Sequence, residues 1–157
     1  FEGPEAHHLR LRCRLAPRTK LDWIRENASR WDADKRRIVG GQPAGIFDLS
    51  AMAPNEPVPG EWWRASREGV TLGYAWMDRT WDGGEILLAV DPTQQGHGVG
   101  TFMLDRLAKE AAARGLNQLY NIVRDTHPER ERVTSWLKER GFAGGEDGEL
   151  RRPVKKR

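Results

Sequence analysis

The clearest pattern of hydrophobic and polar positions lies between residues 61 and 90, where apolar runs alternate with short polar breaks. The segment EWWRASREGVTLGYAWMDRTWDGGEILLAV is interrupted at REG and again at DGG. These breaks separate three predicted strands, at 61–67, 70–80 and 85–90. Connections this short predict an antiparallel meander. The third run, ILLAV, is apolar without alternation, which is typical of a central strand that is covered on both faces.

Two different periods precede this meander. In HHLRLRCRL, leucine and cysteine alternate with basic residues, which predicts a half-buried strand over 7–15. Residues 38–60 are rich in glycine and proline and keep no period, so we expect loops with at most a short helix or strand. Between these segments we expect a helix over 19–37, because four apolar residues recur at helical spacing: Leu21, Ile24, Ala28 and Trp31.

Helix and strand patterns alternate after the meander. A helix is predicted over 99–114, with Gly115 as its stop, and a second over 128–141, with Pro128 near its start. The segment LNQLYNIVR between them predicts a strand, and FAGGEDGELRRPV predicts one or two more. The order of elements predicts an α+β (α/β) fold, in which helices flank a mixed central sheet.

Composition narrows the class of protein. The chain has 157 residues and a mass of 17.9 kDa, which suits one domain with its own core. A single cysteine, Cys13, and the lack of a long apolar run favour a cytoplasmic protein with no membrane contact. The net charge of +3 permits an anionic ligand or partner without requiring one.

The most informative motif is QQGHGVG, which lies between the third strand of the meander and the helix that follows it. Its glycines, Gly96, Gly98 and Gly100, leave backbone N–H groups bare at a helix N-terminus, a setting that suits a phosphate. The spacing matches neither a nucleoside-triphosphate loop nor the G-x-G-x-x-G of dinucleotide-binding proteins. A glycine-rich turn that only joins a strand to a helix is the plain alternative.

Here the sequence resembles the GNAT superfamily of acetyl-CoA-dependent N-acetyltransferases. Its main motif, Q/R-x-x-G-x-G/A, is matched by Gln95, Gly98 and Gly100, and is preceded by LLAVDP. The resemblance reaches back through WWRASREGVTLGYAWMDR and forward to WLKERGF. It implies one GNAT-like domain over 1–157, with loose ends at 1–8 and 151–157, and a mostly antiparallel sheet whose fourth and fifth strands splay apart.

The resemblance also implies where coenzyme A binds. The pyrophosphate would lie against the backbone of the motif, and the amide-bearing pantetheine arm would pair with β-strand backbone in the gap between the splayed strands. The implied cofactor-binding residues are Leu88, Val90, Gln95, Gly96, His97, Gly98, Val99, Gly100 and Thr101. No metal ligand is predicted.

Acetyl transfer to an amine needs a group that takes the amine proton and one that protonates the departing thiolate. Glu85 is the candidate base, although it lies one residue nearer to Val90 than the family pattern has it, which reverses its side chain on a strand unless a bulge intervenes. The tyrosine that relatives use as the acid falls on Leu137 here. Tyr120 is the candidate substitute.

Together these features predict an N-acetyltransferase that moves an acetyl group from acetyl-CoA to a primary amine by direct attack in a ternary complex. The acceptor, a small molecule or a protein, is not identified, and the enzyme is expected to be a monomer or a homodimer. Two alternatives stay open. The missing tyrosine favours a non-catalytic acyl-CoA-binding regulatory module, and the basic tail ELRRPVKKR favours an enzyme that acts on charged tRNA.

Overall fold

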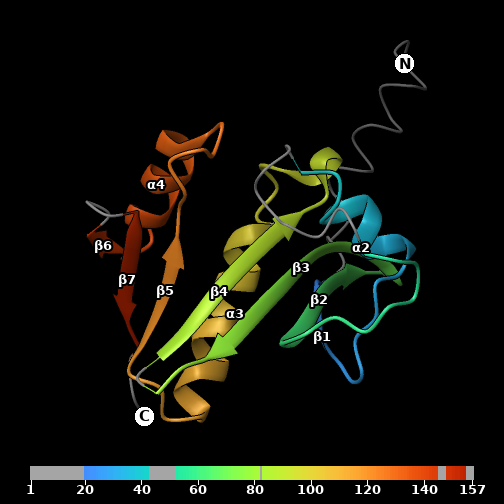
Figure 1. The fold of residues 1–157 in the computed structure, drawn as a ribbon, viewed down its shortest axis with the longest axis horizontal. Coiled ribbons are helices and arrows are strands. Elements are labelled where there is room, and N and C mark those ends of the chain that lie inside the picture. The colour runs from blue at the N-terminus through green and yellow to red at the C-terminus, as the bar shows by residue number, and fades with distance from the viewer. Residues whose placement is uncertain (1–19, 43–51, 82, 145–147, 155–157) are drawn as a thin grey trace, which may run out of the picture.

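The computed structural model describes residues 20–42, 52–81, 83–144 and 148–154. The described strands form one seven-stranded sheet in the order β1-β2-β3-β4-β5-β7-β6 (Figure 1), and only the β4–β5 pair is parallel. The predicted α+β fold with a mostly antiparallel sheet is confirmed. The elements are β1 (Asp22–Glu26), α2 (Ala33–Ile38), β2 (Glu61–Arg67), β3 (Val70–Arg79), β4 (Gly83–Val90), the 3-10 turn η1 (Pro92–Gln94), α3 (Val99–Ala113), β5 (Gln118–Ile122), α4 (Arg130–Lys138), β6 (Ala143–Gly144) and β7 (Glu149–Pro153).

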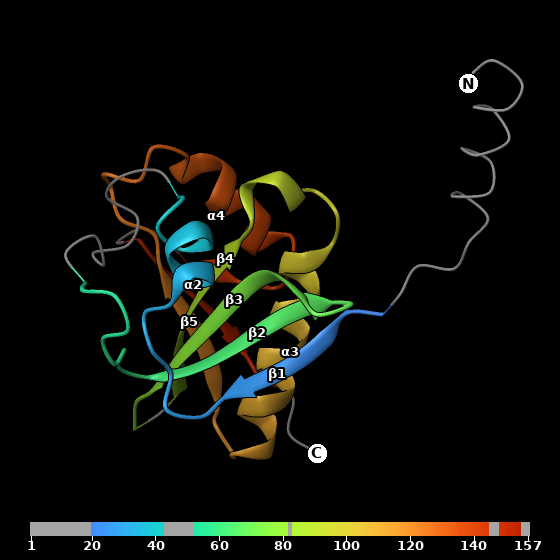
Figure 2. The ribbon, with the colours of Figure 1, turned by 90° about the vertical axis from the view of Figure 1, so that its right-hand side faces the viewer.

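Helices cover both faces of the sheet, with α2 on one face and α3 on the other (Figure 2). The larger core lies under α3, whose buried Met103, Leu104 and Leu107 pack against apolar side chains of β2–β5. A smaller core lies under α2, where Ile38 packs with buried residues such as Tyr74. The sheet is therefore apolar on both faces at β3 and β4, as the ILLAV run predicts.

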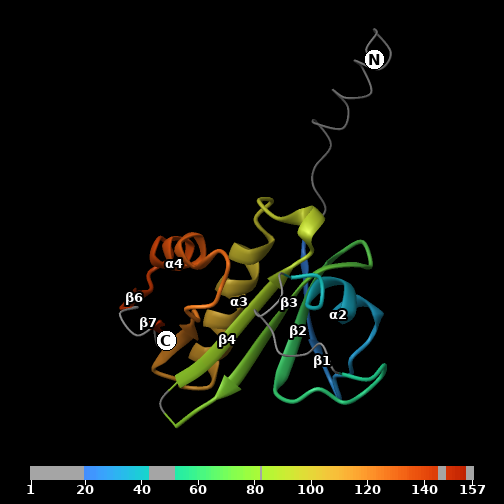
Figure 3. The same cartoon turned by 45° about the horizontal axis from the view of Figure 1, so that its top comes forward.

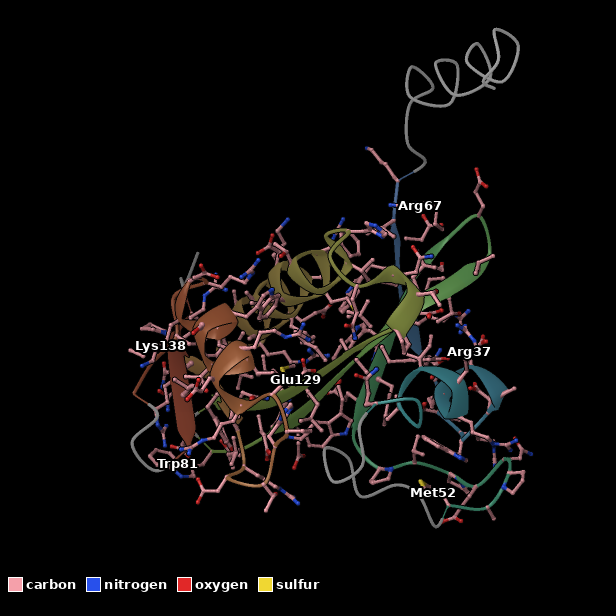
Figure 4. All side chains as sticks on the ribbon, turned by 90° about the horizontal axis from the view of Figure 1, so that it is seen from above. Arg37, Met52, Arg67, Trp81, Glu129 and Lys138 are labelled. Carbon is pink, nitrogen blue, oxygen red and sulfur yellow. The ribbon has the colours of Figure 1, made fainter. Side chains whose placement is uncertain are left out.

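The meander follows its prediction closely. β2 ends at Arg67 and β3 begins at Val70, with Gly69 in the left-handed region at φ 81°. Trp81 stands in the turn between β3 and β4, where it is 95% exposed and lies at the margin of the molecule (Figure 4). The turn residues and the strand alternation are both local signals, which is why the sequence predicts these strands well.

The prediction of one helix over 19–37 is wrong. Asp22–Glu26 forms β1, which pairs antiparallel with β2, and only Ala33–Ile38 is helical. Trp23 stacks on Trp63 of β2 at 5.7 Å between ring centroids, so the apolar residues of this segment are held by the sheet. Ala28 has a positive φ of 52°, which interrupts any continuous helix. The pairing of this segment with β2 therefore outweighs the helical spacing of its apolar residues.

The C-terminal segment is also more ordered than expected. Residues 151–153, predicted to belong to a flexible end, are part of β7 and pair with β5. The strand expected over 7–15 lies outside the described residues, as do residues 1–8 and 155–157. In the second helix, the described turns run from Arg130 to Lys138, within the predicted 128–141.

A buried lysine anchors α2 to the sheet. Lys35 is fully buried, and its Nζ lies 2.6 Å from Glu26 Oε1 and 3.3 Å from Asp32 Oδ2. The ammonium also lies 4.8 Å from the ring centroid of Tyr74. Because an unpaired buried charge is costly, both carboxylates stabilise this position of the helix. Asp32 is in addition the N-cap, since its Oδ1 accepts from the N–H of Lys35 at 2.8 Å.

We expect Asp32→Ala to lower the free energy of unfolding by about 1–2 kcal/mol, because the cap bond and one partner of the buried ammonium are lost together. Asp34→Ala is the matched control in the same first turn, since among the described residues Asp34 forms its ion pair with Arg37, and the Asp34 side chain is half exposed. It should cost less than about 0.5 kcal/mol. Urea unfolding measures both, and equal losses in the two variants would contradict the role given to Asp32.

Candidate active site

β4 and β5 lie side by side only at their first residues. Their parallel register pairs Gly83 with Gln118 and Glu85 with Tyr120, where the pairing ends. β4 nevertheless continues to Val90, and Figure 1 shows the two strands spreading apart from this point. The predicted splay between the fourth and fifth strands is therefore present. It opens an edge of β4 in the middle of the sheet.

The direction of the β4 backbone shows which residues face this opening. The N–H of Asp91 donates to the carbonyl of Leu72 on β3, so Asp91 turns its backbone away from the opening. Backbone groups of an antiparallel strand alternate in direction, and those of Ile86, Leu88 and Val90 therefore point toward the opening. Leu88 and Val90 are the two residues predicted to pair with the pantetheine arm.

Two side-chain amides occupy the ends of this edge. Asn121 Nδ2 donates to the carbonyl of Ile86 at 2.7 Å, and Gln42 Nε2 donates to the carbonyl of Val90 at 3.0 Å. Leu88 lies between them, without a strand partner on this side among the described residues. The open part of the edge is thus centred on Leu88, and the carbonyl of Val90 already has one donor.

The glycine segment turns from β4 into α3. Gly96 and Gly98 have φ values of 83° and 85°, in the left-handed region, and Gly98 is the N-cap of α3 without a side-chain cap bond. A Cβ built on either glycine would meet no heavy atom within 4 Å, so the space beside the backbone is open. Unpaired N–H groups at the helix start next to open space suit an anion, and the residues here fit a phosphate.

Asp91 fixes the start of this turn. Its Oδ1 accepts from the N–H of Thr93 at 2.9 Å and from the Thr93 hydroxyl at 2.8 Å, and its Oδ2 pairs with Arg37 of α2. Burial acts to raise the pKa of Asp91, but these donors outweigh it and hold the pKa below its usual value. The turn is thereby tied to α2 on the opposite face of the sheet from α3.

α4 lies alongside the first turns of α3 (Figure 3). A Cβ added to Gly100 would lie only 3.2 Å from Trp136 Cζ2, so this glycine permits the close approach of the two helices. Leu137, at the position of the usual tyrosine, is 3% exposed and belongs to the core. It presents no polar group to the opening.

Glu85 and Tyr120 are register partners at the point where β4 and β5 begin to separate. Glu85 is paired by register with Asp78 on β3 and with Tyr120 on β5, so the three side chains share one face of the sheet. The β3–β4 register runs without a shift, and Glu85 therefore points away from the face on which Ile86 is buried under α3. The candidate base and the candidate acid are neighbours on the α2 face.

Both groups hold their protons more tightly than usual. Burial, and next the negative charge of Asp78, raise the pKa of Glu85 above its ordinary value. Burial also raises the pKa of Tyr120, while its hydrogen bond with Thr80 acts in the opposite direction. The guanidinium of Arg151 lies 5.5 Å from the Tyr120 ring centroid. A carboxylate with a raised pKa is a stronger proton acceptor than an ordinary one.

The remaining predicted residues take different positions. Gln95 and His97 are exposed in the loop, whereas the side chain of Val99 is 1% exposed in the core, so only its backbone can reach a ligand. Thr101 accepts a hydrogen bond from Arg140 at 3.1 Å. His127, which is not among the predicted residues, lies in the turn before α4, where its Nδ1 accepts from the N–H of Glu129 at 2.9 Å.

A separate cavity of about 300 Å³ lies at the β1 edge of the sheet, where residues 25–30 line it together with Val58, Gly60 and Glu61. β3 lies between β4 and the two strands that line the cavity, β1 and β2. Its buried carboxylate, Glu26, is already paired with Lys35 and Arg64. The cavity therefore includes none of the residues at the opening.

Comparison with known families decides the identity of the fold. The sequence model described as Acetyltransferase (GNAT) family matches residues 20–142, which include the opening, the glycine segment and α4. The chain belongs to the GNAT acetyltransferase family. The predicted resemblance is confirmed, and the chain is an N-acetyltransferase of a family that uses acetyl-CoA. The alternative of a non-catalytic binding module is not supported.

Solved structures share this acetyltransferase fold at low identity. The ribosomal-protein-S18-alanine N-acetyltransferase from Escherichia coli has a TM-score of 0.60 and 17% identity, with 88% of this chain and 96% of that chain covered. N-acetylglutamate synthase from Neisseria gonorrhoeae, complexed with coenzyme A and N-acetyl-glutamate, has a TM-score of 0.60 and 19% identity, with 90% and 37% covered. No curated protein matches the chain in sequence.

The described part of this acetyltransferase holds no group of three His, Cys, Asp or Glu side chains that could bind a metal ion. Within the same residues, no helix is long and apolar enough to cross a membrane.

Proposed function

We propose that this enzyme transfers the acetyl group of acetyl-CoA to a primary amine by direct attack in a ternary complex. The observation that carries the proposal is the register pairing of Glu85 with Tyr120 across β4 and β5, at the residue pair where the pairing of the strands ends. This places a carboxyl and a phenol beside the open edge of β4. Cofactor and acceptor would then meet at the vertex of the opening.

The cofactor would be held at two places. The N–H groups of residues 95–101 would bind its diphosphate, in the open space beside Gly96 and Gly98. The backbone of Leu88 would pair with an amide of the pantetheine arm, as an added strand would. When bound, acetyl-CoA supplies an acetyl thioester. The chain itself supplies the orientation of that thioester and the proton transfers.

Glu85 would take the proton of the amine, whose pKa near 10.4 keeps it charged at neutral pH. The neutral nitrogen would then form a bond to the thioester carbonyl carbon as the C–S bond breaks with its electron pair on sulfur, and the nitrogen would release its second proton to solvent as the amide forms. Tyr120 would give its proton to this sulfur and recover one from solvent. A thiol pKa near 8.5 makes sulfur a fair leaving group even without this help.

The acceptor is proposed only as a primary amine of a small molecule or a protein. The Escherichia coli enzyme acts on an alanine of a ribosomal protein, and the Neisseria gonorrhoeae enzyme binds N-acetyl-glutamate, so the shared fold accepts dissimilar molecules. An acetyl-accepting charged tRNA is a second candidate, favoured by the basic tail of the sequence. A cytoplasmic location and a monomeric or dimeric state remain our predictions.

Two measurements test the proposal. Calorimetric titration should show that acetyl-CoA binds and that ATP and NAD do not, and failure of acetyl-CoA to bind would overturn it. A thiol-release screen should then find turnover with a primary amine and none with its N-methylated tertiary counterpart, which has no proton to lose after attack. For charged tRNA, affinity should fall steeply as salt rises.

We expect Tyr120→Phe to lower kcat about a hundredfold, at the low end for loss of a general acid because thiolate leaves readily. Thr80→Val is the matched control, since it removes the partner of the Tyr120 hydroxyl and keeps the phenol. Its kcat should fall less than about fivefold. Stopped-flow or steady-state thiol release measures both, and an undiminished rate in Tyr120→Phe would exclude Tyr120 as the acid.

A further inference from the structure

The glycine segment that faces the proposed diphosphate site has no permanent cation of its own. Residues 91–101 read DPTQQGHGVGT, without lysine or arginine. The guanidinium of Arg37, which approaches from α2, is already shared between Asp34 and Asp91. A diphosphate is doubly negative, and backbone N–H groups alone leave that charge uncompensated. A cation that adds to these N–H groups would come from a neighbouring element.

Arg140, just after α4, is placed to supply it. Its Nε donates to the hydroxyl of Thr101 at 3.1 Å, which sets the guanidinium against the first turn of α3. Nη1 donates to the carbonyl of Trp136 at 3.0 Å, and the guanidinium lies 4.0 Å from the Trp136 ring centroid. Three contacts from two helices therefore hold a long side chain in one place, which reduces the entropy that binding would otherwise cost.

The charge of Arg140 is also largely uncompensated. Its ion pair with Glu139 is long, at 3.8 Å, and the Glu139 side chain is 75% exposed, so water screens it. The Arg140 side chain is 29% exposed, and its Nη2 has no hydrogen-bond partner among the described residues. A planar guanidinium with a free edge is the group that best matches a phosphate.

We propose that Arg140, stacked on Trp136, is a binding residue for the diphosphate of the acetyl-CoA cofactor. The inference rests on the proposed placement of the diphosphate at residues 95–101. It assigns to α4 a cation that the glycine segment lacks. Gly100 contributes indirectly, because its missing side chain lets Trp136, and with it Arg140, come close to the start of α3.

The test is calorimetric binding of acetyl-CoA and of its 3′-dephospho form to Arg140→Gln, with Arg132→Gln as control. Arg132 lies on α4, eight positions before Arg140, and is 67% exposed and paired with Glu129, so its loss changes the net charge equally without affecting the contact with Thr101. We expect Arg140→Gln to weaken both ligands by the same factor, about tenfold, and Arg132→Gln to weaken neither by more than about twofold. Raising salt from about 50 to about 300 mM should weaken the wild type more than Arg140→Gln, a difference that a purely structural role would not produce.

Three results would overturn the proposal. These are unchanged affinity in Arg140→Gln, a loss confined to acetyl-CoA and absent for the 3′-dephospho form, or an equal loss in Arg132→Gln. If the wild-type enzyme binds neither ligand, the proposed cofactor site itself fails, which is a separate outcome. Thermal unfolding without ligand checks that both variants are folded before they are compared.

Discussion

Gly98→Trp should abolish acetyl-CoA binding, with a dissociation constant raised more than about a hundredfold. The glycine is the N-cap of α3, and the space beside it is open, so an indole side chain would fill the volume proposed for the diphosphate. Since nothing lies within 4 Å of an added Cβ, the side chain leaves the backbone into open space. Calorimetric titration measures the loss, and thermal unfolding shows whether the variant is folded.

The variant Gly98→Ala distinguishes the effect of side-chain volume on acetyl-CoA binding from the effect of backbone strain on stability. Both substitutions place a side chain at φ 85°, which costs about 1–2 kcal/mol of stability. Only tryptophan also fills the site, so the two variants should unfold at similar temperatures, while Gly98→Ala keeps acetyl-CoA affinity within about tenfold of the wild type. If folded Gly98→Trp binds as tightly as wild type, the diphosphate does not lie at this glycine.

Glu85→Gln should lower kcat about a thousandfold and leave acetyl-CoA affinity unchanged. The amide keeps the size of the side chain but cannot take a proton, and a general base contributes about 10²–10⁴ in rate. Because the backbone of Glu85 pairs with β3 and β5 in either form, cofactor binding should not respond. Steady-state thiol release at saturating acceptor measures kcat, and full activity in Glu85→Gln would require another base.

The pH dependence of kcat tests the same residue through a neighbour. A base must be deprotonated to act, so activity rises with pH through the raised pKa of Glu85. Asp78→Asn removes the like charge that contributes to this shift, and the acid limb should move to lower pH. Asp105→Asn, a change of equal charge on α3, should leave the acid limb of the pH profile at the same pH. If the acid limb does not move in Asp78→Asn, the assignment of Glu85 as the base is contradicted.

Local signals account for the parts of the fold that the sequence predicts. The meander and the helix over 99–114 combine strict periodicity with glycine breaks, and both appear within a few residues of their predicted bounds. The segment 19–37 has an equally regular period, but its secondary structure depends on pairing with β2, which lies far along the chain. Stacking of Trp23 on Trp63 cannot be anticipated from spacing alone.

The same division holds for the site. The glycine segment and its link to a helix start were predicted from the motif, because glycine spacing is a property of one short stretch. The meeting of Glu85 with Tyr120 depends on the parallel register of two strands joined through α3. Arg140, which we propose as a diphosphate ligand, is not among the residues predicted from the sequence; its spacing of four residues from Trp136 is the available signal, since such residues are neighbours on a helix.

The two amides that bracket Leu88 have a consequence for the enzyme before it meets its cofactor. An unpaired strand edge inside a sheet invites pairing with another chain, which leads to domain exchange or aggregation. Asn121 and Gln42 occupy the carbonyls on either side, so the exposed ladder is too short to register several consecutive residues of a stray strand. The part of the edge without a donor is therefore about one residue long, a length that suits a single amide better than an extended strand.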